Sequence, residues 1–205
     1  MEQATYLSLS HRAVSEFKDR GSRFIGIALP IAEQADIKIA LEQIKTEFPR
    51  ATHYCYAWRL GFNKTQYRAN DDGEPSGSAG KPILGQIDSL NLTRVLVVVV
   101  RYFGGSKLGV PGLISAYKTA ATQALQEAGI QSFDRCHIAE LEFDYTLMNE
   151  VMRCLKPYNI EIKQQVIGLF CSMNIGIPFR NYNAVLTKLK NIHNLHFTLL
   201  QDDNA

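Results

Sequence analysis

Two glycine-rich segments hold most of the residues that could bind a ligand. The first is DDGEPSGSAGKP (71–82) and the second is RYFGGSKLGVPG (101–112). Each leads into a segment with helical spacing, and a helix N-terminus offers unpaired backbone N–H groups and the positive end of its dipole. We expect both loops to lie side by side and form one anion-binding cleft. The expected contacts are Gly77, Gly80, Lys81, Arg101, Tyr102, Gly104, Gly105, Lys107 and Gly109.

The chemistry of these loops has a functional and a structural interpretation. In the functional one, Lys81, Arg101 and Lys107 contact phosphate, and the glycines supply amides and close approach. The rings of Tyr102 and Phe103 then offer faces on which a base could stack. In the structural one, the glycines only complete turns and the rings belong to the core. The sequence leaves both interpretations open.

An acidic cluster, Asp71, Asp72 and Glu74, lies in the first loop. These carboxylates could hold Mg²⁺ against a phosphate or act as a general base. They could equally complete turns, cap the next helix and pair with Lys81 or Arg101. Adjacent acids lack the separated ligands of a known metal loop, so we favour pairing and expect no metal and no cofactor.

Known catalytic motifs are missing. Gly80-Lys81 lacks the first glycine and the Ser/Thr of a Walker A loop, and neither G-x-G-x-x-G nor G-x-S-x-G occurs. His53, on a predicted strand, is more readily a packed or surface residue than a base. We therefore name no catalytic residue. The cysteines have no zinc-like spacing and are expected to be reduced thiols: Cys55, Cys136, Cys154 and Cys171.

The length and composition limit the number of domains and argue against a membrane-spanning protein. The chain has 205 residues and a net charge of +2, enough for one large or two small domains. Its longest apolar run, Val95 to Val100, is far shorter than the ~20 residues that cross a bilayer. The N-terminus does not resemble a signal peptide. We expect a cytoplasmic protein without a membrane segment.

The elements that must position the loops follow from periodicity. Residues 12–18 and 23–29 predict a hairpin, and 37–48 predict a helix that ends before Pro49. Strands are predicted at 53–60, 65–69 and 95–100, the last covered on both faces because VLVVVV is continuously apolar. Helices follow Pro82 and Pro111; the second presents Ile114, Tyr117, Ala121, Leu125 and Ala128 on one face.

After a link near 130–136, the pattern predicts a second domain. A strand at 138–145, a helix at 147–156, two strands about Gly168, a helix from Tyr182 to Leu189 and a strand at 195–200 follow in order. This β-α-β-β-α-β order is the ferredoxin-like pattern. We predict an α+β protein with domains at 1–134 and 135–205.

The segment from Gly80 to Gly109, together with the preceding DDGEPSGSA, resembles the signature of the IMPACT family, in particular its bacterial YigZ branch. The resemblance implies an N-terminal domain like domain 2 of ribosomal protein S5, followed by the ferredoxin-like domain. The pair also resembles the last two domains of elongation factor G, which contact the ribosome. Eukaryotic members restrain an amino-acid-starvation kinase and carry an RWD domain, which we do not expect here.

Three functional hypotheses follow. The favoured one is a non-enzymatic, translation-linked regulator that binds RNA, the ribosome or a translation factor through the two loops. The alternative is an enzyme that acts on a small phosphorylated metabolite or nucleotide with Mg²⁺. The third is a protein–protein adaptor that uses the exposed sheet of the C-terminal domain. The oligomeric state is left open.

Overall fold

The structure is a computed structural model that describes residues 4–158 and 160–202. The chain divides into two compact units, Tyr6–Phe133 and Asp134–Ala205, the latter joined by the N-terminal residues up to Thr5. This division falls one residue before the predicted boundary. Each unit is described by itself.

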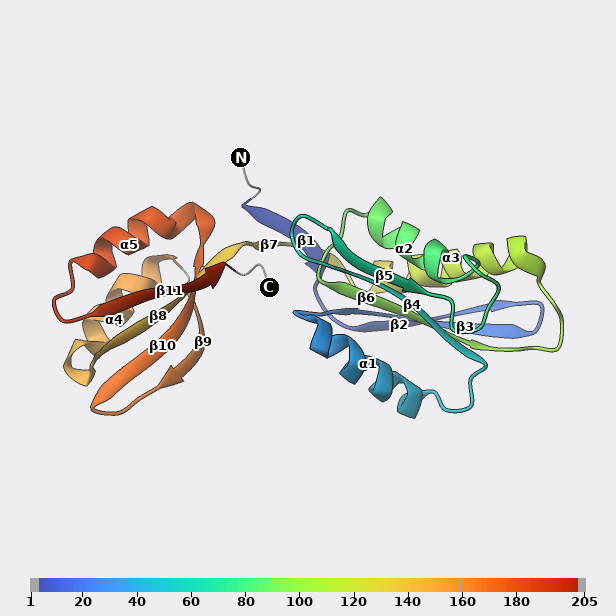
Figure 1. The fold of residues 1–205 in the computed structure, drawn as a ribbon, viewed down its shortest axis with the longest axis horizontal. Coiled ribbons are helices and arrows are strands. Elements are labelled where there is room, and N and C mark those ends of the chain that lie inside the picture. The colour runs from blue at the N-terminus through green and yellow to red at the C-terminus, as the bar shows by residue number, and fades with distance from the viewer. Residues whose placement is uncertain (1–3, 159, 203–205) are drawn as a thin grey trace. The chain divides into compact units, whose positions relative to one another are not determined.

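The N-terminal unit is built on an antiparallel sheet with the strand order β2-β3-β6-β4-β5 (Figure 1). The hairpin and all the strands predicted for this sheet are present. Their bounds are Ala13–Asp19 for β2, Ser22–Pro30 for β3, His53–Leu60 for β4, Gln66–Asn70 for β5 and Val95–Tyr102 for β6.

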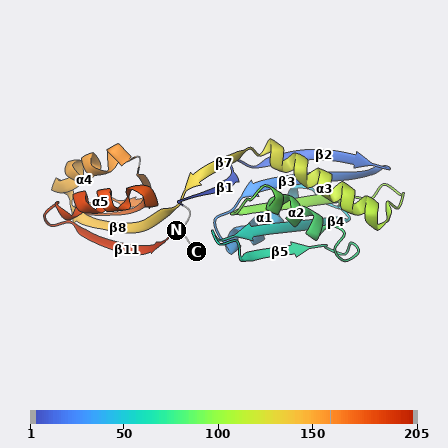
Figure 2. The same cartoon turned by 90° about the horizontal axis from the view of Figure 1, so that it is seen from above.

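Helices cover both faces of this sheet. On one side α1 (Gln34–Glu47) packs on a cluster that includes Leu96, Val98 and Val100. On the other side α2 (Gly80–Ser89) and α3 (Gly109–Glu127) pack on a cluster that includes Val95, Val97 and Val99. Figure 2 shows α3 lying along β2 and β3. The apolar run of β6 is therefore covered on both faces, as predicted.

Several element boundaries differ from the predictions. Strand β6 continues through Arg101 and Tyr102, so the second loop starts at Phe103. Helix α2 begins two residues before Pro82. Leu113 is buried on α3, whereas Ile114, predicted to face the core, is 39% exposed.

Two short strands were not predicted. Strand β1 (Thr5–Leu9) pairs with β7 (Ile130–Asp134), which the sequence pattern had indicated as a link. Strand β7 is half-exposed and shows no apolar alternation, so its strand conformation depends on a partner about 120 residues away.

The C-terminal unit has the order β8-α4-β9-β10-α5-β11, and its antiparallel sheet runs β11-β8-β10-β9. Buried residues of β8 and β10 pack against α4 and α5. The α+β prediction and the ferredoxin-like order are confirmed. The bounds are Cys136–Asp144 (β8), Met148–Leu155 (α4), Glu161–Val166 (β9), Phe170–Pro178 (β10), Tyr182–Lys190 (α5) and His196–Asp202 (β11).

Short 3-10 turns at Tyr145–Leu147, Lys156–Tyr158 and Phe179–Asn181 adjoin the helices of this unit. Within residues 4–158 and 160–202, no helix has the length and apolar character needed to cross a bilayer.

Candidate functional site

The two glycine-rich loops border one cleft, which we call the two-loop cleft. Its volume is about 430 Å³. The first loop contributes Glu74 and Pro75, and the second contributes the segment from Lys107 to Val110. Phe103 also belongs to the second loop. The remaining lining residues come from β4 and the residue before it, the end of β6, and α3: Thr52, His53, Arg101 and Leu113.

A buried ion pair forms part of the cleft wall. Arg101 Nη1 donates to Glu74 Oε1 at 2.6 Å, and both side chains are almost fully buried. The hydroxyl of Tyr117 donates to the same oxygen at 2.8 Å. That Arg101 contacts phosphate stays a prediction, and the structure adds that its side chain is buried and paired. Arg101 points inward from the end of a strand, and Glu74 already balances its charge.

One donor of Arg101 remains unused. Its Nε is buried and has no hydrogen-bond partner among the described residues. Phe24 and Phe103 lie on the guanidinium, with 5.4 and 5.5 Å from Cζ to their ring centroids. The guanidinium is therefore fixed in position within the cleft wall.

Behind the ion pair lies a set of buried hydroxyl and thiol groups. Cys55 Sγ donates to the Tyr117 hydroxyl at 3.3 Å. Burial raises the pKa of Cys55 to about 12 and also raises the pKa of Tyr117. Both groups are therefore neutral at physiological pH. Tyr117 was predicted only as a buried face residue, although a buried tyrosine usually indicates a polar partner.

His53 also lines the cleft. Its Nδ1 lies 2.7 Å from the carbonyl oxygen of Asp72. A carbonyl only accepts, so Nδ1 carries the proton and Nε2 is the free acceptor of the neutral ring. Nε2 lies 3.9 Å from Glu74 Oε1.

The carboxylate of Asp71 occupies the N-terminus of α2. Its oxygens accept from the backbone N–H groups of Gly77 at 2.8 Å, Ala79 at 3.0 Å and Gly80 at 2.8 Å. Burial alone would raise the pKa of Asp71, but these three hydrogen bonds outweigh it and lower the pKa. The expected anion site of the first loop is therefore filled by the chain itself.

The other acids of the cluster are also engaged. Asp72 accepts from the backbone N–H of Tyr54 at 2.6 Å, and Glu74 holds Arg101 and Tyr117. Across the described ranges, no group of three or more His, Cys, Asp or Glu side chains is arranged to hold a metal ion. This geometry favours the pairing interpretation of the cluster.

The second loop is more open. Among the described residues, no side chain caps the N-terminus of α3, which starts at Gly109. Lys107 is exposed beside it and has no ion-pair partner in the part of the chain that the structure describes. Lys107 and this helix end are therefore the groups most available to an anion.

Of the nine predicted contacts, three line the two-loop cleft, namely Arg101, Lys107 and Gly109. The other six do not line it: Gly77, Gly80, Lys81, Tyr102, Gly104 and Gly105. Tyr102 packs against the cluster under α1 and donates to the carbonyl of Pro49 at 3.1 Å. Lys81 lies on the first turn of α2, with its side chain near Gly77. The aromatic ring at the cleft is Phe103, which is 49% exposed.

Several glycines of the two loops are required by the fold itself. A Cβ on Gly104 would lie 1.9 Å from the carbonyl carbon of Gly21, and one on Gly80 would lie 2.6 Å from the backbone nitrogen of Asn70. The close approach is thus between segments of backbone. Gly77, Gly105 and Gly109 have positive φ, which disfavours other residues.

A family model and the similar proteins of known sequence all point to the same family. The model of the Impact N-terminal domain family matches residues 20–125. An IMPACT family member of Haemophilus influenzae is 32% identical over 91% of this chain and 91% of its own length. IMPACT family member YigZ of Escherichia coli is 39% identical over 77% of this chain and 78% of its own length. A crystal structure titled only as a hypothetical protein has a TM-score of 0.74 at 27% identity, covering 97% of this chain and 98% of that chain.

Proposed function

Since the chain belongs to the IMPACT family, we propose that it is a translation-linked binding protein whose two-loop cleft takes a phosphate-bearing partner. The family resemblance supports the translation-linked role. The chemistry of the cleft supports the kind of partner, and the partner we favour is RNA, alone or within the ribosome.

The observation that carries the proposal is the convergence of cationic and amide donors on one hollow. Lys107 and the open N-terminus of α3 border the two-loop cleft, and Arg101, paired with Glu74, forms part of its wall. A helix N-terminus with a nearby cation favours phosphate oxygens. The exposed ring of Phe103 adds a face on which a base can stack.

The same geometry supports RNA binding with little specificity for the RNA sequence. Phosphate contacts supply affinity and depend on salt, whereas base edges supply specificity. The cleft offers a ring face but few side chains suited to reading a base edge, because Glu74 and Arg101 already pair with each other. Binding should therefore weaken steeply as salt rises.

Co-sedimentation with purified ribosomal subunits tests the proposal. We expect binding at ~50 mM salt that falls sharply by ~200 mM. Lys107→Gln should weaken it and reduce the slope of log K against log salt by about 1. The matched control is Lys118→Gln, since Lys118 is exposed on α3 and does not line the cleft. Salt-independent binding, or equal loss in both variants, would contradict the proposal.

One observation favours the enzyme alternative. His53 lines the cleft, and the hydrogen bond of its Nδ1 to the Asp72 carbonyl leaves Nε2 as the atom that could accept a proton from a substrate. The acids of the first loop give this alternative less support, because each already accepts hydrogen bonds from the protein. A thermal-shift screen with ATP and Mg²⁺ distinguishes the two: a large shift that Asp72→Asn abolishes would favour the enzyme.

A further inference from the structure

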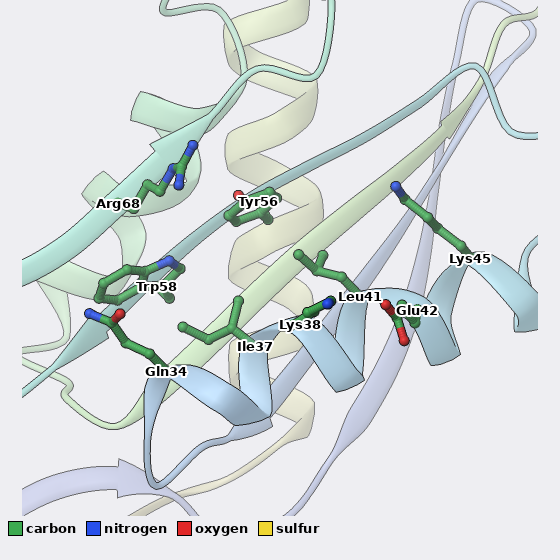
Figure 3. A pocket seen from close by; sticks show the side chains of 9 residues that line it. All are labelled: Gln34, Ile37, Lys38, Leu41, Glu42, Lys45, Tyr56, Trp58 and Arg68. Carbon is green, nitrogen blue, oxygen red and sulfur yellow. The ribbon is translucent and has the colours of Figure 1, made fainter. Parts of the chain in front are cut away.

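A second hollow lies in the N-terminal unit between α1 and the strands β4 and β5 (Figure 3). We call it the α1 groove. Its volume is about 350 Å³. Its lining combines aliphatic, aromatic and charged side chains: Gln34, Ile37, Lys38, Leu41, Glu42, Lys45, Tyr56, Trp58 and Arg68.

The groove exists because α1 covers only part of its face of the sheet. The buried residues Ile37, Ala40 and Ile44 seat the helix on a cluster that includes residues of β3 and β6. Trp58 of β4 is paired with Arg68 of β5, and paired residues of neighbouring strands share a face. Arg68 therefore lies beside Trp58, across from the flank of α1 (Figure 3).

The charges along the groove are unbalanced. Of the described residues that line it, Lys38, Lys45 and Arg68 are cationic and only Glu42 is acidic. Lys38 and Arg68 are exposed and form no ion pair within the described ranges. Lys45 Nζ lies 5.7 Å from the centre of the Tyr54 ring. The groove is thus prepared for a ligand that carries negative charge.

The floor of the groove is apolar and aromatic. Ile37, Leu41, Tyr56 and Trp58 supply it, with Trp58 mostly buried and Tyr56 partly exposed. Small-ligand pockets usually combine such a floor with a few polar groups and measure about 300–1,000 Å³. A planar ring joined to an anion fits both the size and the lining.

We propose that the α1 groove binds a nucleotide, with its base against Tyr56 and Trp58 and its phosphate among Lys38, Lys45 and Arg68. The nucleotide is either free or one unit of an RNA strand, since the recognising chemistry is the same. An acidic peptide would match the cations but would leave the aromatic floor unused, and the compact hollow suits one unit better than an extended chain.

This proposal is independent of the two-loop cleft. Trp58 belongs to the cluster on the α1 face of the sheet, whereas Leu108 and Leu113 of the cleft belong to the cluster under α2 and α3. The two sites therefore lie on opposite faces. Trp58 is also the single tryptophan of the chain, so its fluorescence reports on the α1 groove alone.

The test is a titration of the full chain followed by Trp58 emission with excitation at the red edge. The probes are AMP, hexauridylate, inorganic phosphate and hexaglutamate. We expect a saturable change with AMP or hexauridylate, and the tighter of the two identifies a free or a strand-bound nucleotide. Lys38→Gln/Arg68→Gln should weaken that binding at least about tenfold, because it removes two charge-assisted contacts.

The control variant is Lys118→Gln/Lys190→Gln, which removes the same charge from exposed positions on α3 and α5. It should bind within about twofold of the unaltered chain, since it loses no direct contact. The proposal is overturned if neither nucleotide gives a saturable change. It is overturned equally if both double variants bind alike, or if hexaglutamate binds as tightly as hexauridylate.

Discussion

Glu74 Oε1 lies 2.6 Å from Arg101 Nη1, and this ion pair ties the first glycine-rich loop to the end of β6. The two side chains are only 4% and 6% exposed. A charge removed from such a pair leaves its partner buried and uncompensated. The pair therefore holds the first loop against β6 and also forms part of the wall of the two-loop cleft.

Glu74→Gln keeps the shape of the side chain but removes its charge. We expect it to lower the free energy of unfolding by about 3–5 kcal/mol, because Arg101 stays buried without a counter-ion. Urea unfolding followed by Trp58 emission measures this for the N-terminal unit. Glu74→Leu/Arg101→Met should cost less than the single change. A single variant as stable as the unaltered chain would show that the pair is open to water.

Asp71→Asn removes the carboxylate that caps α2. At neutral pH we expect a loss of about 0.5–2 kcal/mol, the usual range for a lost N-cap. The folded-state pKa of Asp71 is lowered, so its contribution is full above the ordinary value of 3.8 and is lost as the pH falls through the folded value. The stability difference should therefore shrink in acid. A difference that does not depend on pH would contradict the capping role.

Gly104→Ala tests whether this glycine serves the fold or a ligand. The new Cβ would meet the backbone of Gly21 at 1.9 Å, so we expect a loss of about 1–3 kcal/mol or more. Gly85→Ala is the control, since nothing lies within 4 Å and a helical alanine is favoured by up to about 1 kcal/mol. Thermal unfolding compares the two. Unchanged stability in Gly104→Ala would support a ligand contact instead.

Cys55 should be unreactive in the native chain. Its thiol is fully buried, and burial raises its pKa to about 12, so almost no thiolate exists at pH 8. Iodoacetamide followed by peptide mass mapping should leave Cys55 unmodified and label it only after denaturation. Cys136, which is partly exposed, is the internal control. Rapid labelling of native Cys55 would show that the core around it opens to solvent.

Strong periodic patterns predicted most of the fold. The continuous apolar run of β6 predicted a strand covered on both faces, because no other environment suits it. The alternation at 138–145 likewise predicted β8. Strands β1 and β7 could not be predicted, because each is short and depends on the other across the chain.

The candidate site was harder to predict residue by residue. Arg101 is followed by Tyr102 and Phe103, which favour strands, but the glycines after them led to a loop predicted from Arg101 onward. The continued strand and the inward side chain were therefore missed. The pairing of acids and bases was one stated alternative, but the three amides around Asp71 depend on the path of the loop. The α1 groove depends on the pairing of Trp58 with Arg68, which only the sheet register fixes.

The carboxylate at the start of α2 has a consequence for how the two loops respond to their surroundings. It is tethered to the helix it caps, so its local concentration far exceeds that of any dissolved anion. Dissolved anions at high ionic strength compete with an anionic ligand bound at Lys107. They hardly compete with the Asp71 carboxylate at the N-terminus of α2. At high salt the first loop should therefore keep its conformation, whereas the second loop should lose its bound ligand. One side of the cleft is thus held by the chain itself, and the other depends on the ligand.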